Sequence, residues 1–112
     1  VTGDSHNGWA FDLPEGGKPA GVEFGGHSVT SPGYEAVTTG KKPLDVAREV
    51  VAASPELKWM DASNRGYMHL SLTPAAATNT WVFMDSVAKL GLATKAGHSM
   101  TVRKGRRVLE AA

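Results

Sequence analysis

The sequence predicts an α+β domain made mostly of antiparallel strands with one main helix. One segment, residues 43–54, has the apolar spacing of a helix, whereas residues 66–73 alternate as a strand does. The 13 glycines and 6 prolines indicate many turns between short strands. A chain of 112 residues is at most one small domain. We therefore treat residues 1–112 as a single segment.

The composition excludes several classes of protein. A net charge of +1 gives no bulk attraction to nucleic acid, and the absence of cysteine excludes disulfides and cysteine-rich zinc sites. No run of eighteen apolar residues could span a membrane, and no basic-then-apolar leader opens the sequence. The one basic cluster is predicted to be a solvated turn, too small for a nucleic-acid interface. It comprises Arg103, Lys104, Arg106 and Arg107.

The first residues hold the densest group of potential metal ligands. Residues 1–4 are expected to end a strand, and in an extended segment the side chains of Asp4 and His6 would project to one side. A carboxylate and an imidazole aimed at one spot suit a metal ion. From these residues alone, however, a capping or turn role for Asp4 and a surface position for His6 is the favoured interpretation, and a metal site is the alternative. Trp9 and Phe11 are predicted to anchor this segment in the core.

Two glycine-rich stretches follow. Residues 14–21 have the composition of a loop, and residues 21–24 are predicted to form a short strand. Residues 25–33 contain His27, Ser28 and further hydroxyl side chains between glycines. They favour a hairpin whose hydroxyls bond their own backbone, with a loop that lines a polar site as the alternative. The Lys-Ser/Thr ending of a phosphate-binding loop is absent.

The predicted helix begins at Pro43, which suits a first helical turn, and Pro55 ends it. Its apolar stripe should pack on a sheet. The stripe consists of Leu44, Ala47, Val50 and Val51.

The rest of the chain is predicted to be β-structure. A short strand at 57–61 and a turn at 62–65 precede the strand 66–73, in which Met68, Leu70 and Leu72 should form the buried face. His69 lies on the opposite, mixed face and is expected to be a surface or cross-strand residue.

The partner of that strand should be residues 80–87. A loop at 89–97 and a final hairpin, 98–102 with 106–110, complete the prediction. His98 falls in this hairpin and receives no role.

Three segments together resemble the alkaline phosphatase D, or PhoD-like, metallophosphatase family. The first is Thr2-Gly-Asp-Ser-His6 with the following Trp9-Ala-Phe-Asp-Leu13. The second is Val22-Glu-Phe24 with Ser28-Val-Thr-Ser-Pro-Gly33, and the third runs from Lys58-Trp-Met-Asp61 through Arg65-Gly-Tyr67 to Thr73-Pro74. The order and rough spacing of the segments also fit, and the resemblance spans most of the chain.

The resemblance implies a fold and a chemistry. It implies the C-terminal portion of a calcineurin-like two-sheet sandwich, with the N-terminal part of the enzyme absent from this sequence. The implied activity is hydrolysis of phosphate monoesters and diesters, with iron and calcium as the metal ions. Members of the family are usually exported, to the periplasm or outside the cell.

Carried over residue by residue, the resemblance makes Asp4 and His6 metal ligands. A metal-binding histidine needs a partner that fixes its tautomer, and Asn7, Asp12 and Ser28 are the candidates. His27 departs from the family's pattern, in which a small or hydroxyl residue is more common. Two ligands do not hold a catalytic metal tightly, so the chain should be inactive without the missing part. The alternative function is a non-enzymatic β-rich binding or structural module.

Overall fold

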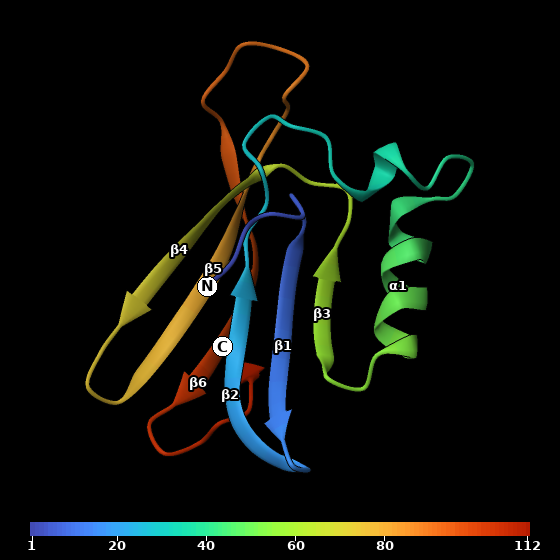
Figure 1. Cartoon of the computed structure of the whole chain (residues 1–112). Coiled ribbons are helices and arrows are strands. Elements are labelled where there is room, and N and C mark those ends of the chain that lie inside the picture. Colours follow the sequence, from blue (N-terminus) through green and yellow to red (C-terminus); the bar gives the residue numbers. More distant parts are fainter.

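The computed structural model describes all 112 residues and contains two antiparallel sheets and one α-helix (Figure 1). One sheet has the order β2-β1-β3, formed by Gly8–Glu15 (β1), Lys18–Gly25 (β2) and Leu57–Asp61 (β3). The other has the order β4-β5-β6-β7, formed by Gly66–Leu72, Ala76–Met84, Thr94–Arg103 and Glu110–Ala111. A 3₁₀ helix, η1, spans Tyr34–Ala36, and α1 spans Pro43–Ala53. The predicted α+β class, with mostly antiparallel strands and one helix, is confirmed.

The two sheets face each other and share the main core. Ala10 and Phe24 from the first sheet join the buried side chains of Trp81, Phe83 and Met100 from the second. The indole N–H of Trp81 donates across the interface to the carbonyl of Gly25 over 2.7 Å. The sheets are therefore joined by both apolar packing and a buried hydrogen bond, as in a sandwich.

Strand β1 lies at the centre of the first sheet and presents a different set of residues to each layer. Ala10 points into the sandwich, while Trp9 and Phe11 pack on the other side with Leu57 and Met60. This alternation follows from the two-residue repeat of a strand. The expectation that Trp9 and Phe11 anchor the segment is met on the helix side of the sheet.

Helix α1 covers that side next to β3 (Figure 1). It begins at the predicted Pro43 and ends one residue before Ser54, which caps it. The predicted stripe is wrong in one member, because Leu44 is 61% exposed whereas Val46 is buried beside Ala47. Leu44 lies in the first turn of the helix and lines an open hollow with Trp59 and Met60 of β3.

The predicted loop at 14–21 is instead a hairpin. Strands β1 and β2 continue to Glu15 and from Lys18, so only Gly16 and Gly17 form the turn, with φ of 55° and 75°. Glycine adopts such positive φ angles without steric cost. Pro14 fits into β1 because β3 pairs with β1 only as far as Phe11, and Pro19 fits into β2 because β2 is an edge strand.

Strand β4 is less buried than predicted. Met68 is partly buried, but Leu70 is 37% and Leu72 is 70% exposed. The strand is at the edge of its sheet and diverges from the three-stranded sheet (Figure 1). Alternation identified the strand correctly, but no second layer covers its apolar face.

The last third of the chain pairs as predicted, with shifted boundaries. The partner of β4 is β5, which begins at Ala76 rather than at residue 80. The loop covers 85–93 instead of 89–97, and residues 106–109 are not part of the final hairpin, because β7 contains only two residues. The predicted hairpin at 25–33 is absent, since β2 ends at Gly25 and an irregular loop leads to η1. Neither helix has the length and apolar character needed to cross a membrane.

Candidate functional site

The first residues form a turn and not the predicted strand end. Thr2 makes a single parallel bridge to Gly25, and the chain then turns, with the His6 N–H directed to the Gly3 carbonyl at 3.4 Å. His6 has a φ of 62°, which is uncommon for a residue other than glycine. The expectation that Asp4 and His6 share one side of an extended segment is therefore wrong. The carboxylate of Asp4 lies at the surface in a hollow of about 360 Å³.

The ring of His6 is held by the loop that follows β2. Its Nδ1 lies 2.9 Å from the carbonyl oxygen of Pro32. Because a carbonyl only accepts hydrogen bonds, Nδ1 must carry the proton, and in the neutral ring Nε2 keeps its lone pair. Such a carbonyl partner is the usual support of a metal-binding histidine. None of the candidates Asn7, Asp12 and Ser28 hydrogen-bonds to His6.

Asn7 instead ties the turn to the loop. It is 1% exposed, its amide nitrogen donates to the Ser5 carbonyl over 2.6 Å, and its oxygen accepts from the Tyr34 N–H over 2.9 Å. The loop comes so close that a Cβ on Gly33 would be 2.5 Å from the Asn7 oxygen. Hydrogen bonds and close packing thus join the N-terminal turn and residues 32–34 into one unit.

An ion pair between distant parts of the chain lies behind this unit. Glu35, in η1, pairs with the guanidinium of Arg65, which directly precedes β4 and whose side chain is 8% exposed. The same Glu35 oxygen, Oε1, accepts from the Gly33 N–H over 3.0 Å. Burial lowers the pKa of Arg65 below its ordinary value. An arginine this buried requires a charged partner, and Glu35 supplies it.

His27 lies between the sheets. Its side chain is fully buried, its Nε2 is 3.0 Å from Oδ1 of Asp61, and its Nδ1 has no partner. The ring packs edge-on against Trp59 and Phe83. A Cβ on Gly8 would be 2.3 Å from the ring, so only glycine at that position leaves room for His27. His27 therefore joins β2 to the end of β3 and does not line an open site.

Asp61 is a strongly stabilised carboxylate. Burial raises the pKa of its carboxyl, but hydrogen bonds from His27, Asn64 and Ser63 outweigh that effect and lower the pKa from 3.8 to about 2. Sequence reasoning treated Asp61 only as the end of a strand and as part of a family-like segment.

The two remaining candidates for contact with His6 lie elsewhere. Asp12 accepts a hydrogen bond from the Leu109 N–H over 2.7 Å and pairs with Lys58 at 3.5 Å, so it joins the two sheets. The Ser28 hydroxyl accepts from the N–H groups of Thr30 and Ser31. That is the local backbone bonding that the favoured interpretation of this stretch predicted, although the hairpin itself is absent.

The other two histidines are apart from the turn. His69 is exposed opposite Thr80, which confirms its expected cross-strand position. His98 stacks on Trp59 with ring centroids 4.6 Å apart, and burial lowers its pKa below the ordinary 6.5.

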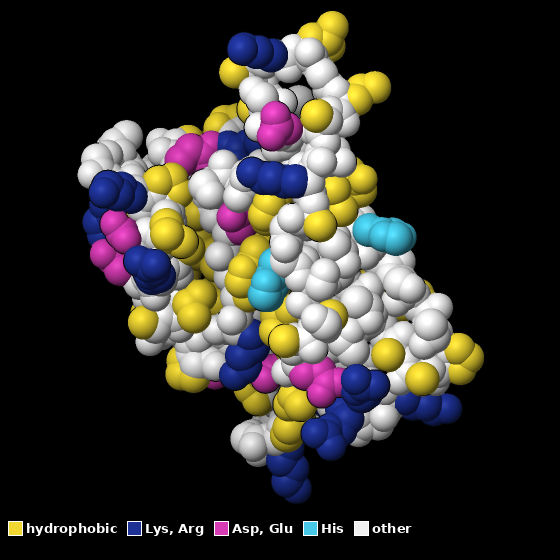
Figure 2. All heavy atoms as spheres, turned by 180° about the vertical axis from the view of Figure 1, so that it is seen from behind, with side chains coloured by type: hydrophobic (Ala, Val, Ile, Leu, Met, Phe, Trp, Pro, Cys, Tyr) yellow, Lys and Arg dark blue, Asp and Glu magenta, His cyan; other side chains and the backbone are white.

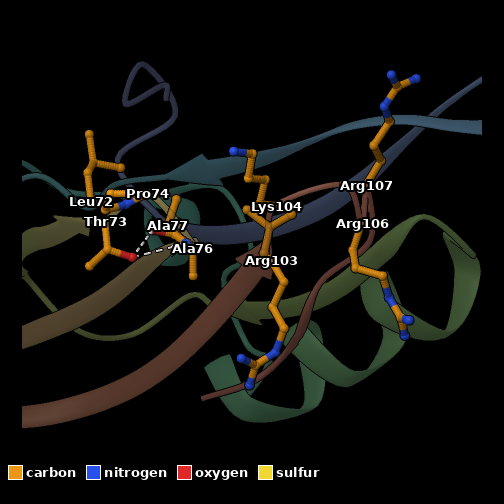
Figure 3. Close-up of a pocket in the computed structure, with 11 residues that line it drawn as sticks. Leu72, Thr73, Pro74, Ala76, Ala77, Arg103, Lys104, Arg106 and Arg107 are labelled. Carbon is orange, nitrogen blue, oxygen red and sulfur yellow. Dashed lines mark hydrogen bonds between the residues drawn. The ribbon is translucent and has the colours of Figure 1, made fainter.

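The basic cluster forms the predicted turn between β6 and β7. In Figure 2, Lys and Arg side chains gather at the lower end of the molecule, and Figure 3 shows those of this turn beside a hollow of about 530 Å³. The guanidinium groups of Arg106 and Arg107 point in different directions (Figure 3). Arg103 forms an ion pair with Glu110. Because these side chains point apart, they do not form a single anion-binding site.

No group of three His, Cys, Asp or Glu side chains in the chain is arranged to hold a metal ion. A metal bound by Asp4 and His6 would need further donors from outside these residues. The residues that sequence reasoning missed are Pro32, Glu35 and Arg65. Pro32 acts through its carbonyl, which no side-chain pattern reveals, while Arg65 was noticed only as part of a family-like segment.

A family model described as PhoD-like phosphatase matches residues 1–81. A solved structure titled "Structure of PhoD" has a TM-score of 0.74 and 24% identity, over 98% of this chain and 21% of that one. The chain thus spans about a fifth of the length of that structure. No curated protein matches.

Proposed function

Because the chain belongs to the PhoD-like phosphatase family, we propose that it is the C-terminal portion of a metal-dependent hydrolase of phosphate monoesters and diesters. In this proposal, Asp4 and His6 are two of the metal ligands. The remaining donors belong to an N-terminal part of the same enzyme, which this chain does not contain.

The hydrogen bond from His6 Nδ1 to the Pro32 carbonyl is the observation that supports the proposal most directly. It fixes the tautomer in which Nε2 can donate its lone pair to a metal. The carboxylate of Asp4 makes no hydrogen bond within the chain and is exposed, so its oxygens are free to bind a cation. An oxygen and an imidazole nitrogen suit hard or borderline ions, and iron and calcium are the proposed pair.

When bound, the metal ions would polarise the phosphoryl oxygens and activate the attacking water. The residues of this chain prepare that chemistry by supplying one negative charge and one oriented imidazole. Asn7 and the loop 32–34 hold the imidazole in place. By the same family membership, we propose that the enzyme is exported and acts in the periplasm or outside the cell.

The test uses the complete enzyme that carries this segment. Asp4→Asn and His6→Ala should each lower the bound metal, measured by elemental analysis, together with turnover of a phosphomonoester and a phosphodiester. Matched controls are Asp45→Asn on the outer side of α1 and His69→Ala on β4, both of exposed residues. The ligand assignment is wrong if the two site variants keep the metal and the turnover of the controls.

The 112-residue chain alone should show no turnover, since it offers two donors and no third. A non-enzymatic β-rich module, the alternative drawn from the sequence, predicts instead that chelators leave the complete protein unchanged. Metal analysis before and after chelation separates these two functions.

A further inference from the structure

The peptide bond between Pro32 and Gly33 connects His6 to a buried ion pair. Its carbonyl accepts from His6 Nδ1, at 2.9 Å, and its N–H donates to Oε1 of Glu35, at 3.0 Å. A peptide unit is planar, so its C=O and N–H point in opposite directions and turn together. The orientation that serves His6 is therefore set from the other side by Glu35.

Glu35 is itself held by Arg65. The same Oε1 that accepts from Gly33 also receives the Arg65 guanidinium. Arg65 can hardly move, because its side chain is 8% exposed, its NH1 donates to the Asn64 carbonyl over 2.9 Å, and its own carbonyl accepts from the Met84 N–H. The start of β4 thus fixes the position of the Glu35 carboxylate.

Few other contacts could replace this connection. The Asn7 oxygen receives the next N–H along the loop, that of Tyr34, and so holds the loop near the turn. It accepts no hydrogen bond from the Gly33 N–H, which is the donor of the Pro32–Gly33 peptide. Only Glu35 accepts from that donor.

Resting on the function proposed above, we propose that Arg65 and Glu35 are positioning residues which, through the Pro32–Gly33 peptide, hold the His6 ring so that Nε2 faces the metal. They do not touch metal or substrate themselves. Loss of the pair would free the peptide to rotate, and His6 would then sample both tautomers and other ring orientations.

The experiment is a double-mutant cycle in the complete enzyme, read as the concentration of EDTA at which half the iron and calcium is lost. Glu35→Gln keeps the shape and an acceptor for Gly33 but removes the charge that holds Arg65. It should lower the half-loss EDTA concentration about tenfold or more, the usual effect of losing a partner behind a metal ligand. Glu49→Gln, which removes an exposed carboxylate paired with Lys41, is the matched control and should change nothing.

The His6→Ala background decides between positioning and a general structural role. If the pair acts through His6, Glu35→Gln should have no further effect on metal retention once the imidazole is gone. An equal effect in both backgrounds would overturn the proposal, as would wild-type retention in the single variant. If Glu35→Gln does not melt cooperatively, Arg65→Lys replaces it in the same double-mutant cycle. This variant keeps the positive charge but loses the planar set of guanidinium donors.

The cycle also separates this inference from the proposed function. If His6→Ala alone leaves metal retention unchanged, the ligand assignment fails. If His6→Ala lowers retention and the Glu35 and Arg65 variants do not, only the positioning role fails.

Discussion

At the scale of single residues, close approach decides what the candidate site tolerates. Gly33 is where the loop after β2 touches the N-terminal turn, and a Cβ there would also be 3.0 Å from the His6 carbonyl. Gly21, in β2, faces open space by comparison. Adding a side chain at these two glycines should therefore affect stability differently, although both occur in glycine-rich stretches.

Gly33→Ala should lower the unfolding free energy by about 1–3 kcal/mol, because overpacking pushes the loop off Asn7. Gly21→Ala should be neutral or slightly stabilising, since its Cβ meets nothing and the unfolded chain loses freedom. Urea denaturation of the two variants measures both values. Equal stabilities would contradict the close approach.

Asp61 gives a pH dependence with a defined sign. Its folded pKa of about 2 is below the ordinary 3.8, so its contribution is fully present above 3.8 and is lost as the pH falls toward about 2. A difference of this size corresponds to about 2 kcal/mol. At pH 7 the free energy of unfolding of the wild type should exceed that of Asp61→Asn by about that amount. This difference in stability should become smaller as the pH falls below 3.8. If urea denaturation gives the same difference in unfolding free energy at pH 2 as at pH 7, the charge of Asp61 does not cause it.

At the scale of elements, helix α1 and strand β3 show what periodicity can and cannot predict. The helix boundaries followed from Pro43 and Pro55, which act locally through the backbone. The buried face was predicted less well, because Leu44 fits the stripe but is 61% exposed, whereas Val46 is buried. Leu57, at the start of β3, is 3% exposed beneath the helix.

Leu57→Ala should therefore cost about 2–5 kcal/mol through lost burial and a residual cavity. Leu44→Ala, the same chemical change at a 61% exposed position, should change stability by about 0.5 kcal/mol or less. Thermal and urea unfolding of both variants test the comparison. A large cost at Leu44 would mean that the helix packs in a different rotation.

At the scale of the whole molecule, few direct polar contacts join the two sheets. Trp81 is completely buried and donates to the Gly25 carbonyl, while Asp12 accepts from the Leu109 N–H on the other side of the sandwich. Each contact connects residues far apart in the sequence. Together with the shared core they should make both sheets unfold in one transition.

Trp81→Phe should cost about 1–3 kcal/mol from the unpaired Gly25 carbonyl, in addition to the lost volume. Trp59→Phe is the matched control, because Trp59 packs in the same cluster with no hydrogen bond from its indole in the chain. Calorimetry should show a larger loss for Trp81→Phe. Similar losses in the two variants would mean that packing, and not the hydrogen bond to Gly25, accounts for the contribution of Trp81.

The sequence by itself determined the class of fold, the helix at Pro43 and the pairing of β4 with β5, because local backbone chemistry and strand alternation encode them. It also determined the family, confirmed by the match to residues 1–81. The partner of His6 was decided only by the tertiary structure. The carbonyl of Pro32 contacts His6, and the ion pair between Arg65 and Glu35 lies behind it, both through folding of segments far apart in the sequence. Patterns of side chains along the sequence do not predict contacts that distant segments make through backbone atoms.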